Sequence, residues 1–182
     1  TAGGFGVDTT SGDVDYSAVK DAFDVPNPNE IDFTKGGSGT LTLDDANDWN
    51  GNTKVSGGTL QLNENLNTDG IEGTEETAKI NLNSRNITIN EPDDGTTNTF
   101  EGKITGAGNI TKDGDSTQEL TGENEFQGDV NLINDGDDDD NTLVMNFKND
   151  DTITQNITVT AQNGTEFGFK TPDTSGITFA GE

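Results

Sequence analysis

The stretch TKGGSGTLTLDDANDWNGNTKV (residues 34–55) recurs 77 residues later as TKDGDSTQELTGENEFQGDVNL (residues 111–132). The two copies share a Thr-Lys pair before a glycine turn, one leucine (Leu43, Leu120), and an Asn-acid-aromatic-amide-Gly block that begins at Asn47 and at Asn124. Agreement among Gly, Thr and Asn can arise by chance, but the shared order of Lys, Leu and aromatic residues favours a repeat. Self-similarity of this kind is typical of units that stack to bury a shared apolar face.

Composition indicates a thin core. The chain has 182 residues, which is enough for one domain, or one domain with an arm. Only 26% of the residues are hydrophobic, while 24 are glycine. A thick two-layer core needs more apolar residues, whereas a stack of short strands manages with one inward side chain in two.

Short runs of alternating apolar and Thr or Asn residues follow one another from residue 31 onward, and each ends in a Gly, Asn or Asp turn. This pattern predicts an all-β fold. Two architectures remain open: a parallel β-solenoid with an N-terminal arm, and an antiparallel β-sandwich or jelly roll with strand exchange. The internal repeat favours the solenoid. The clearest runs are 41–43, 60–62, 80–82, 87–89, 130–132, 157–159, 167–169 and 177–179.

Residues 1–30 differ from the body, which we expect to span 31–182 with repeat units near 34–62 and 111–145. The segment 16–23 predicts a short amphipathic helix with Tyr16, Val19 and Phe23 on one side. An alternating segment around Phe5 and Val7 predicts a strand. Such an arm either packs on the body or reaches a neighbouring subunit.

Three runs carry a family resemblance: FEGKITGAGNITK (residues 100–112), TLTL followed by NDWNG (40–51), and GGTLQL (57–62). In this order they resemble the autotransporter-associated β-strand repeat of bacterial passenger domains, over roughly residues 31–132. The resemblance implies a right-handed parallel β-helix on an exported surface or adhesive protein, and it implies no catalytic residues. About one and a half units are present, so the resemblance fits a detached module, a fragment or a small exported subunit.

The formal net charge of −26, with no histidine and nine Lys and Arg residues in total, argues against nucleic-acid binding. It also argues against anionic membrane surfaces, and no apolar run approaches the length that membrane insertion requires. High charge with low hydrophobicity is also typical of disorder. The regular alternation with punctuating glycines favours an ordered chain instead.

The chemistry available for catalysis is sparse. The absence of Cys and His removes the usual nucleophiles and bases, so we expect no enzyme activity. Paired carboxylates can hydrolyse glycosides, but among 35 acidic residues no pair stands out, and an anionic polysaccharide would be repelled.

The densest acidic cluster is a weak Ca²⁺ candidate, because Ca²⁺ takes six to eight oxygen ligands in loose geometry. The cluster lacks the glycine and closing glutamate of an EF-hand loop, so a solvated, repelling loop is the alternative. Calcium is the one cofactor that the sequence suggests. The candidate ligands are Asp135, Asp137, Asp138, Asp139 and Asp140.

The termini suggest how subunits would join. The candidate interface residues are Phe5 and Val7 at one end and Ile177 and Phe179 at the other, each pair in an alternating run. Either strand could complete the open sheet edge of the next subunit, which gives a head-to-tail homopolymer. The alternative is that both termini fold back on their own body.

Two aromatic residues hold equivalent places in the repeat. Trp49 and Phe126 could stack against sugars, but aromatic residues at equivalent positions of a solenoid repeat more often fill the core. Together these features predict a secreted structural protein, found outside the cell or on its surface after signal-peptide removal. Its function would be that of a subunit in an extracellular filament, matrix or surface layer. The alternative is an adhesin-type module that binds glycan or host protein.

Overall fold

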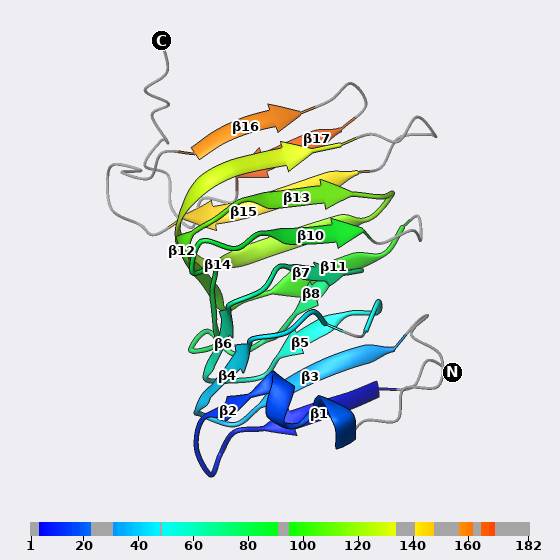
Figure 1. Cartoon of the computed structure of the whole chain (residues 1–182). Helices are drawn as coiled ribbons and strands as arrows, with labels where there is room; N and C mark the ends of the chain where they lie inside the picture. Colours follow the sequence, from blue (N-terminus) through cyan, green and yellow to red (C-terminus); the bar gives the residue numbers. More distant parts are fainter. Residues whose placement is uncertain are drawn as a thin grey trace.

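The chain folds as a parallel β-solenoid. The computed structural model describes residues 4–22, 31–47, 49–90, 95–133, 141–147, 157–161 and 165–169. Strands of successive coils stack side by side, and every described strand pair is parallel (Figure 1). The predicted all-β solenoid is therefore confirmed, and the antiparallel sandwich is wrong.

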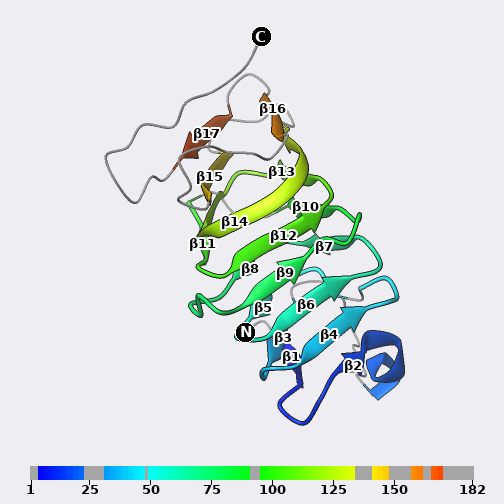
Figure 2. The ribbon, with the colours of Figure 1, turned by 90° about the vertical axis from the view of Figure 1, so that its left-hand side faces the viewer.

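Each coil has three sides, which we name the first, second and third face. The first face holds β1 (Gly4–Asp8), β3 (Asp32–Gly36), β5 (Thr53–Val55), β8 (Ile71–Glu72), β11 (Thr97–Phe100), the start of β14 (Thr117–Leu132), β15 (Thr142–Phe147) and β17 (Glu166–Phe169). The second face, seen frontally in Figure 2, holds β2 (Val14–Asp15), β4 (Thr40–Leu43), β6 (Thr59–Leu62), β9 (Lys79–Asn81), β12 (Lys103–Ala107) and the middle of β14. The third face holds β7 (Leu66–Thr68), β10 (Ile87–Asn90), β13 (Ile110–Asp113), the end of β14, and β16 (Ile157–Ala161).

Period-two alternation builds the core. On the second face Leu41, Leu60 and Ile80 lie opposite one another in successive strands, and all three are fully buried. Several contacts between coils join residues 20 positions apart, such as the one from Asn52 to Asp32. Between the start of β3 and the end of β14 the chain makes about five coils. One inward residue in two therefore suffices to fill the interior.

The two copies of the repeat lie on different faces. The first copy begins in β3 on the first face, whereas the second begins in β13 on the third face. Their separation of 77 residues is not a whole number of 20-residue coils. On each face most inward side chains are apolar and the outward ones polar, so a three-strand unit can start on any of them.

The N-terminal segment forms two single 3₁₀ turns where the sequence predicts an amphipathic helix over 16–23. They are η1 (Tyr16–Ala18) and η2 (Lys20–Ala22), and Val19 N–H donates to the Tyr16 carbonyl at 2.9 Å. An i, i+3 spacing in a 3₁₀ turn still places Tyr16 and Val19 on one side, toward the core. Phe23 lies outside the described residues.

A polar side chain ties three coils together inside the solenoid. Gln118 is fully buried on the first face, where it lies opposite Asn98 of the preceding coil. Its amide reaches one coil further, accepting the N–H of Ile71 and donating to the Ile71 carbonyl, both at 2.9 Å. It also donates to the Asn98 carbonyl at 3.2 Å. The Gln118 amide thus takes the place of a neighbouring strand for the N–H and the carbonyl of Ile71 in β8.

Replacing Gln118 with leucine should lower the free energy of unfolding by about 2 kcal/mol, because the Ile71 N–H and carbonyl would lose a buried partner. Urea unfolding followed by circular dichroism measures this. The matched control is Gln61→Leu on the outward side of β6, where a change below about 0.5 kcal/mol is expected. Equal effects of the two substitutions would refute a structural role for the buried amide.

Candidate functional site

The interface candidates that can be located are part of the chain's own sheet. Phe5 and Val7 lie in β1, which pairs with β3 of the same chain along its whole length. Val7 is buried, and Phe5 packs edge-on against Phe33 with ring centroids 5.2 Å apart. Strand β1 is therefore paired within its own chain. Ile177 and Phe179 lie outside the described residues.

The candidate calcium ligands Asp135, Asp137, Asp138, Asp139 and Asp140 also lie outside the described residues. The residues that flank them, Ile133 and Asn141, meet at the turn between the third and first faces, where Asn141 Nδ2 donates to the Ile133 carbonyl. Within the described part of the chain, no group of three acidic side chains is arranged to hold a metal ion. Calcium binding at the Asp run stays a prediction.

If the Asp run binds Ca²⁺, calorimetric titration of residues 1–182 with CaCl₂ should give a saturable heat. The heat should vanish when Asp137, Asp138, Asp139 and Asp140 are all replaced by asparagine, because carboxylate oxygens supply the charge that Ca²⁺ requires. Titration with MgCl₂ is the control for general screening of the acidic surface. A flat CaCl₂ titration of the unmodified chain would refute the prediction.

Both repeat-equivalent aromatics are core residues, which confirms that interpretation over sugar stacking. Trp49 is 1% exposed and stacks on Phe33 at a centroid distance of 4.1 Å. Its Nε1–H donates to Thr53 Oγ1 at 2.8 Å. Phe126 is fully buried on the second face. Neither ring can stack against a sugar from solvent.

The lysine of each repeat is buried and holds the glycine turn that follows it. Lys35 Nζ donates to the carbonyls of Gly36, Gly37 and Gly57, each at 2.9 Å, and to Thr9 Oγ1 at 2.8 Å. Burial lowers the pKa of the Lys35 ammonium, against the opposing carboxylates of Asp8 and Asp13. These contacts join three successive coils at one corner.

The second copy repeats this arrangement on another face. Lys112 is likewise fully buried, and its Nζ donates to the carbonyls of Asp113 and Gly114 at 2.8 Å. The alternation in Phe33-Thr-Lys35 and Ile110-Thr-Lys112 already places both lysines inward, which is the signal that could have identified them. Because a lysine ammonium is normally expected to face water, the alternation alone does not lead us to predict buried lysines.

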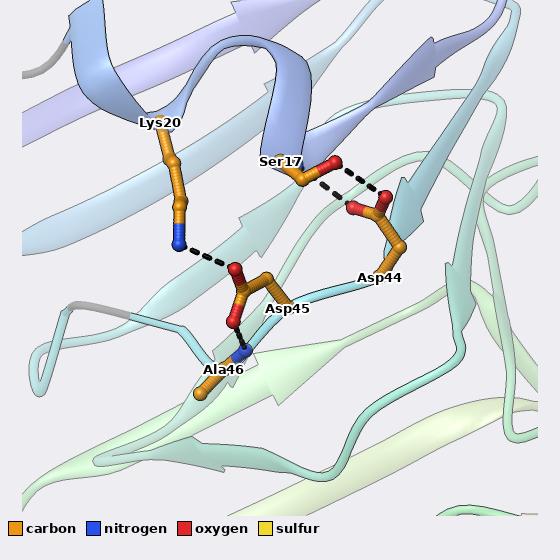
Figure 3. Close-up of polar contacts among 5 residues, drawn as sticks. All are labelled: Ser17, Lys20, Asp44, Asp45 and Ala46. Atoms are coloured by element: carbon orange, nitrogen blue, oxygen red, sulfur yellow. Dashed lines mark hydrogen bonds and ion pairs between the residues drawn. The ribbon is translucent and has the colours of Figure 1, made fainter.

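The 3₁₀ turns are latched onto the loop after β4 by two carboxylates (Figure 3). Asp44 accepts the Ser17 N–H at 2.8 Å and the Ser17 hydroxyl at 2.5 Å. Asp45 pairs with the Lys20 ammonium and accepts the Ala46 N–H. Burial raises the pKa of Asp44, but the Ser17 hydrogen bonds outweigh it and leave the pKa below its usual value. The Lys20 ammonium holds down the pKa of Asp45.

Lowering the pH should release this latch. Both carboxyls have folded-state pKa values below the usual 3.8, so their contribution to stability is present above pH 3.8 and is lost as the pH falls through the lowered values. Hydrogen exchange at η1 and β2, measured between pH 5 and about pH 2.5, should accelerate beyond the intrinsic pH trend. The variant Asp44→Asn/Asp45→Asn should show that protection loss already at pH 5. Unchanged protection in this variant would contradict the latch.

A hollow of about 560 Å³ lies at the corner between the first and second faces. Lys103, which lines it, pairs its Nζ with Glu125 at 3.9 Å. The hollow is lined by Glu76, Glu101, Lys103, Thr121, Gly122, Glu123 and Asn146.

The third face carries two straight rows of outward polar side chains. The first row, which we name the corner ladder, begins each strand, and every rung is tied to the next coil. Asn86 N–H donates to Asn65 Oδ1 at 3.0 Å, Asn109 N–H to Asn86 Oδ1 at 3.0 Å, and Asp129 N–H to Asn109 Oδ1 at 2.9 Å. The second row, the outer column, lies two residues further on and consists of Asn67, Thr88, Thr111 and Asn131.

The two rows together are nearly uncharged. The second face instead carries Lys79, Lys103 and Glu125 on its outward side, and the first face carries Asp32, Lys54 and Glu72. On the third face Asp129 is the one charged residue among the eight of the two rows, and Asp113 lies outward beyond them at the end of β13. The N-x-N, N-x-T and D-x-N spacing around an inward Leu, Ile or Val is the sequence signal for both rows.

Comparison with known proteins identifies the repeat. The model of the passenger-associated-transport repeat matches residues 33–62 and 110–136. Over 129 residues the chain is 33% identical to the adhesin BmaC autotransporter of Brucella suis biovar 1 (strain 1330). The match covers 57% of this chain and 4% of that protein, so the chain corresponds to a small part of its relative's length. No solved structure matches the chain.

No helix in the described part of the chain is long and apolar enough to cross a membrane. The matched segments begin in β3 and in β13, each just before a buried lysine and its glycine turn. The predicted resemblance is thereby confirmed, and this chain is a parallel β-solenoid that carries two autotransporter passenger-type repeats.

Proposed function

We propose that this chain is a segment of the surface-exposed passenger of an autotransporter adhesin, in which the solenoid is a rigid shaft with a binding face. The observation that carries the proposal is the match of both repeats within a parallel solenoid, together with 33% identity to an autotransporter adhesin. The proposal places the chain outside the cell and assigns it no catalytic activity.

A shaft function agrees with the way the solenoid is reinforced. Buried Lys35 and Lys112 hold corners of the stack, and Gln118 bridges three coils. Stability in a solenoid is the sum of contacts between neighbouring coils, so such links make a long stack stiff. A stiff stack keeps an outward face in constant register, and binding then loses little conformational entropy.

The filament hypothesis gains no support from the described residues. The filament hypothesis requires β1 to pair with the next subunit, but β1 is hydrogen-bonded to β3 of its own chain. We therefore expect residues 1–182 to sediment as a monomer. Regular filaments under the electron microscope would contradict a monomer and support the filament hypothesis.

Adhesion can be tested with beads that carry residues 1–182 through a single terminal attachment. Beads with the folded chain should adhere to cultured epithelial cells more strongly than beads with the Trp49→Ala variant, which should be partly unfolded. Lys54→Met, an outward substitution on the first face, is the matched control for a folded variant. Equal adhesion of folded and unfolded chains would contradict an adhesin function for this segment.

A further inference from the structure

We propose that the third face, defined by the corner ladder and the outer column, binds an uncharged polysaccharide laid across β7, β10, β13 and the end of β14. This inference rests on the proposed adhesin function, for which it names the ligand class. The strands concerned lie one above another in Figure 1.

Charge selects the ligand class. The chain has a net charge of −26, which disfavours anionic polymers as ligands. The third face presents mostly amide and hydroxyl groups; its two rows hold one charged residue, Asp129, and Asp113 lies outward at the end of β13. Amides and hydroxyls both donate and accept hydrogen bonds, which matches the hydroxyl groups of a neutral sugar.

The outer column has unused hydrogen-bonding capacity. Asn67 is exposed, and Thr88, Thr111 and Asn131 are partly exposed. Their side chains make no hydrogen bond to other described residues, in contrast to the corner ladder. These side chains could therefore hydrogen-bond a ligand without first breaking a hydrogen bond within the protein.

The corner ladder holds the face in place. Because each Asn Oδ1 accepts a backbone N–H of the next coil, the amides of Asn65, Asn86 and Asn109 are fixed with Nδ2 left as a donor. Successive strands lie about 4.8 Å apart, so the polar groups recur at a regular spacing along the stack. A regular array suits a polymer with a repeating unit better than a single small molecule.

No described aromatic side chain lies on this face, since Trp49, Phe100 and Phe126 are buried in the core. Recognition would therefore rest on hydrogen bonds, which are individually weak, and affinity would grow with the number of coils contacted. This favours a long polysaccharide over a short oligosaccharide.

Affinity electrophoresis in native gels tests the inference, with dextran, hydroxyethylcellulose or alginate cast in the gel. The chain should be retarded by at least one of the two neutral polymers at both low and high salt, and not by alginate. Retardation by neither neutral polymer, or equal retardation by alginate, would overturn the inference.

Paired variants assign the binding to the face. Thr88→Val/Thr111→Val keeps the β-branched shape and removes two hydroxyls, and it should weaken retardation by about five-fold per hydroxyl. Thr88→Ser/Thr111→Ser keeps the hydroxyls and should retain binding. Thr42→Val/Thr59→Val on the second face is the matched control and should bind normally. Loss in the control, or loss in the serine pair with an unchanged melting temperature, would overturn the assignment.

The bead assay separates the two proposals. Adhesion of beads without any gel retardation leaves the adhesin function standing and removes the polysaccharide ligand. Retardation without adhesion leaves the ligand and removes the adhesin function for this segment.

Discussion

Trp49→Ala should lower the free energy of unfolding by about 4 kcal/mol, the largest effect that we expect from one substitution. The indole is 1% exposed and packs on three aromatic rings, with centroids 4.1 Å from Phe33, 5.5 Å from Tyr16 and 5.9 Å from Phe5. Alanine would leave a cavity between β1, the 3₁₀ turns and the body. Urea unfolding followed by circular dichroism measures the loss.

Trp49→Phe is the matched control for Trp49→Ala. It keeps a ring in the cluster and removes the Nε1–H donor to Thr53, so it should cost about 1 to 2 kcal/mol. Because Trp49 is the one tryptophan of the chain, its fluorescence also reports directly on burial. Emission typical of a water-exposed indole in the native protein would contradict the packing of the N-terminal segment on the body.

Lys35→Met should lower the free energy of unfolding by about 3 kcal/mol, because the partly buried carbonyls of Gly37 and Gly57 would lose their donor. The Gly36 carbonyl should suffer less, since it also accepts the N–H and the hydroxyl of Thr9. Methionine keeps most of the side-chain volume, so the measured loss reports on the hydrogen bonds. Urea unfolding again gives the value.

Lys54→Met is the control for charge removal, since Lys54 is exposed on the neighbouring strand β5, and its effect should stay below about 0.5 kcal/mol. Lys112→Met tests the repeat equivalence and should resemble Lys35→Met. If Lys35→Met were as mild as Lys54→Met, the buried ammonium would be no structural link between coils.

Much of the fold could be predicted from local pattern. Alternation in runs such as 41–43, 60–62 and 87–89 places Leu and Ile inward and Thr or Gln outward, and these runs lie in β4, β6 and β10. The segment 16–23 was predicted less well. Its amphipathic spacing is satisfied equally by 3₁₀ turns, and the contacts of Ser17 and Lys20 with Asp44 and Asp45 fix the turns in place.

The candidate site was predictable only in part. The N-x-T and N-x-N spacing marks residues that point outward from a strand, yet it does not say which strands become neighbours. Only the register of β7, β10, β13 and β14 aligns Asn67, Thr88, Thr111 and Asn131 into one column. The sequence correctly predicted a strand around Phe5 and Val7. It could not predict that this strand pairs with β3 of the same chain.

That this chain is a stack of short strands follows from its sequence, because period-two alternation is a property of neighbouring residues and the repeat of 34–55 at 111–132 needs no knowledge of the fold. The face that each repeat occupies, and the bridging of three coils by Gln118, become visible only in the folded chain. Coil length varies, so the residue that stacks on a given position depends on every turn between them. Inward or outward direction is set locally, whereas neighbours across coils are set by the winding of the whole chain.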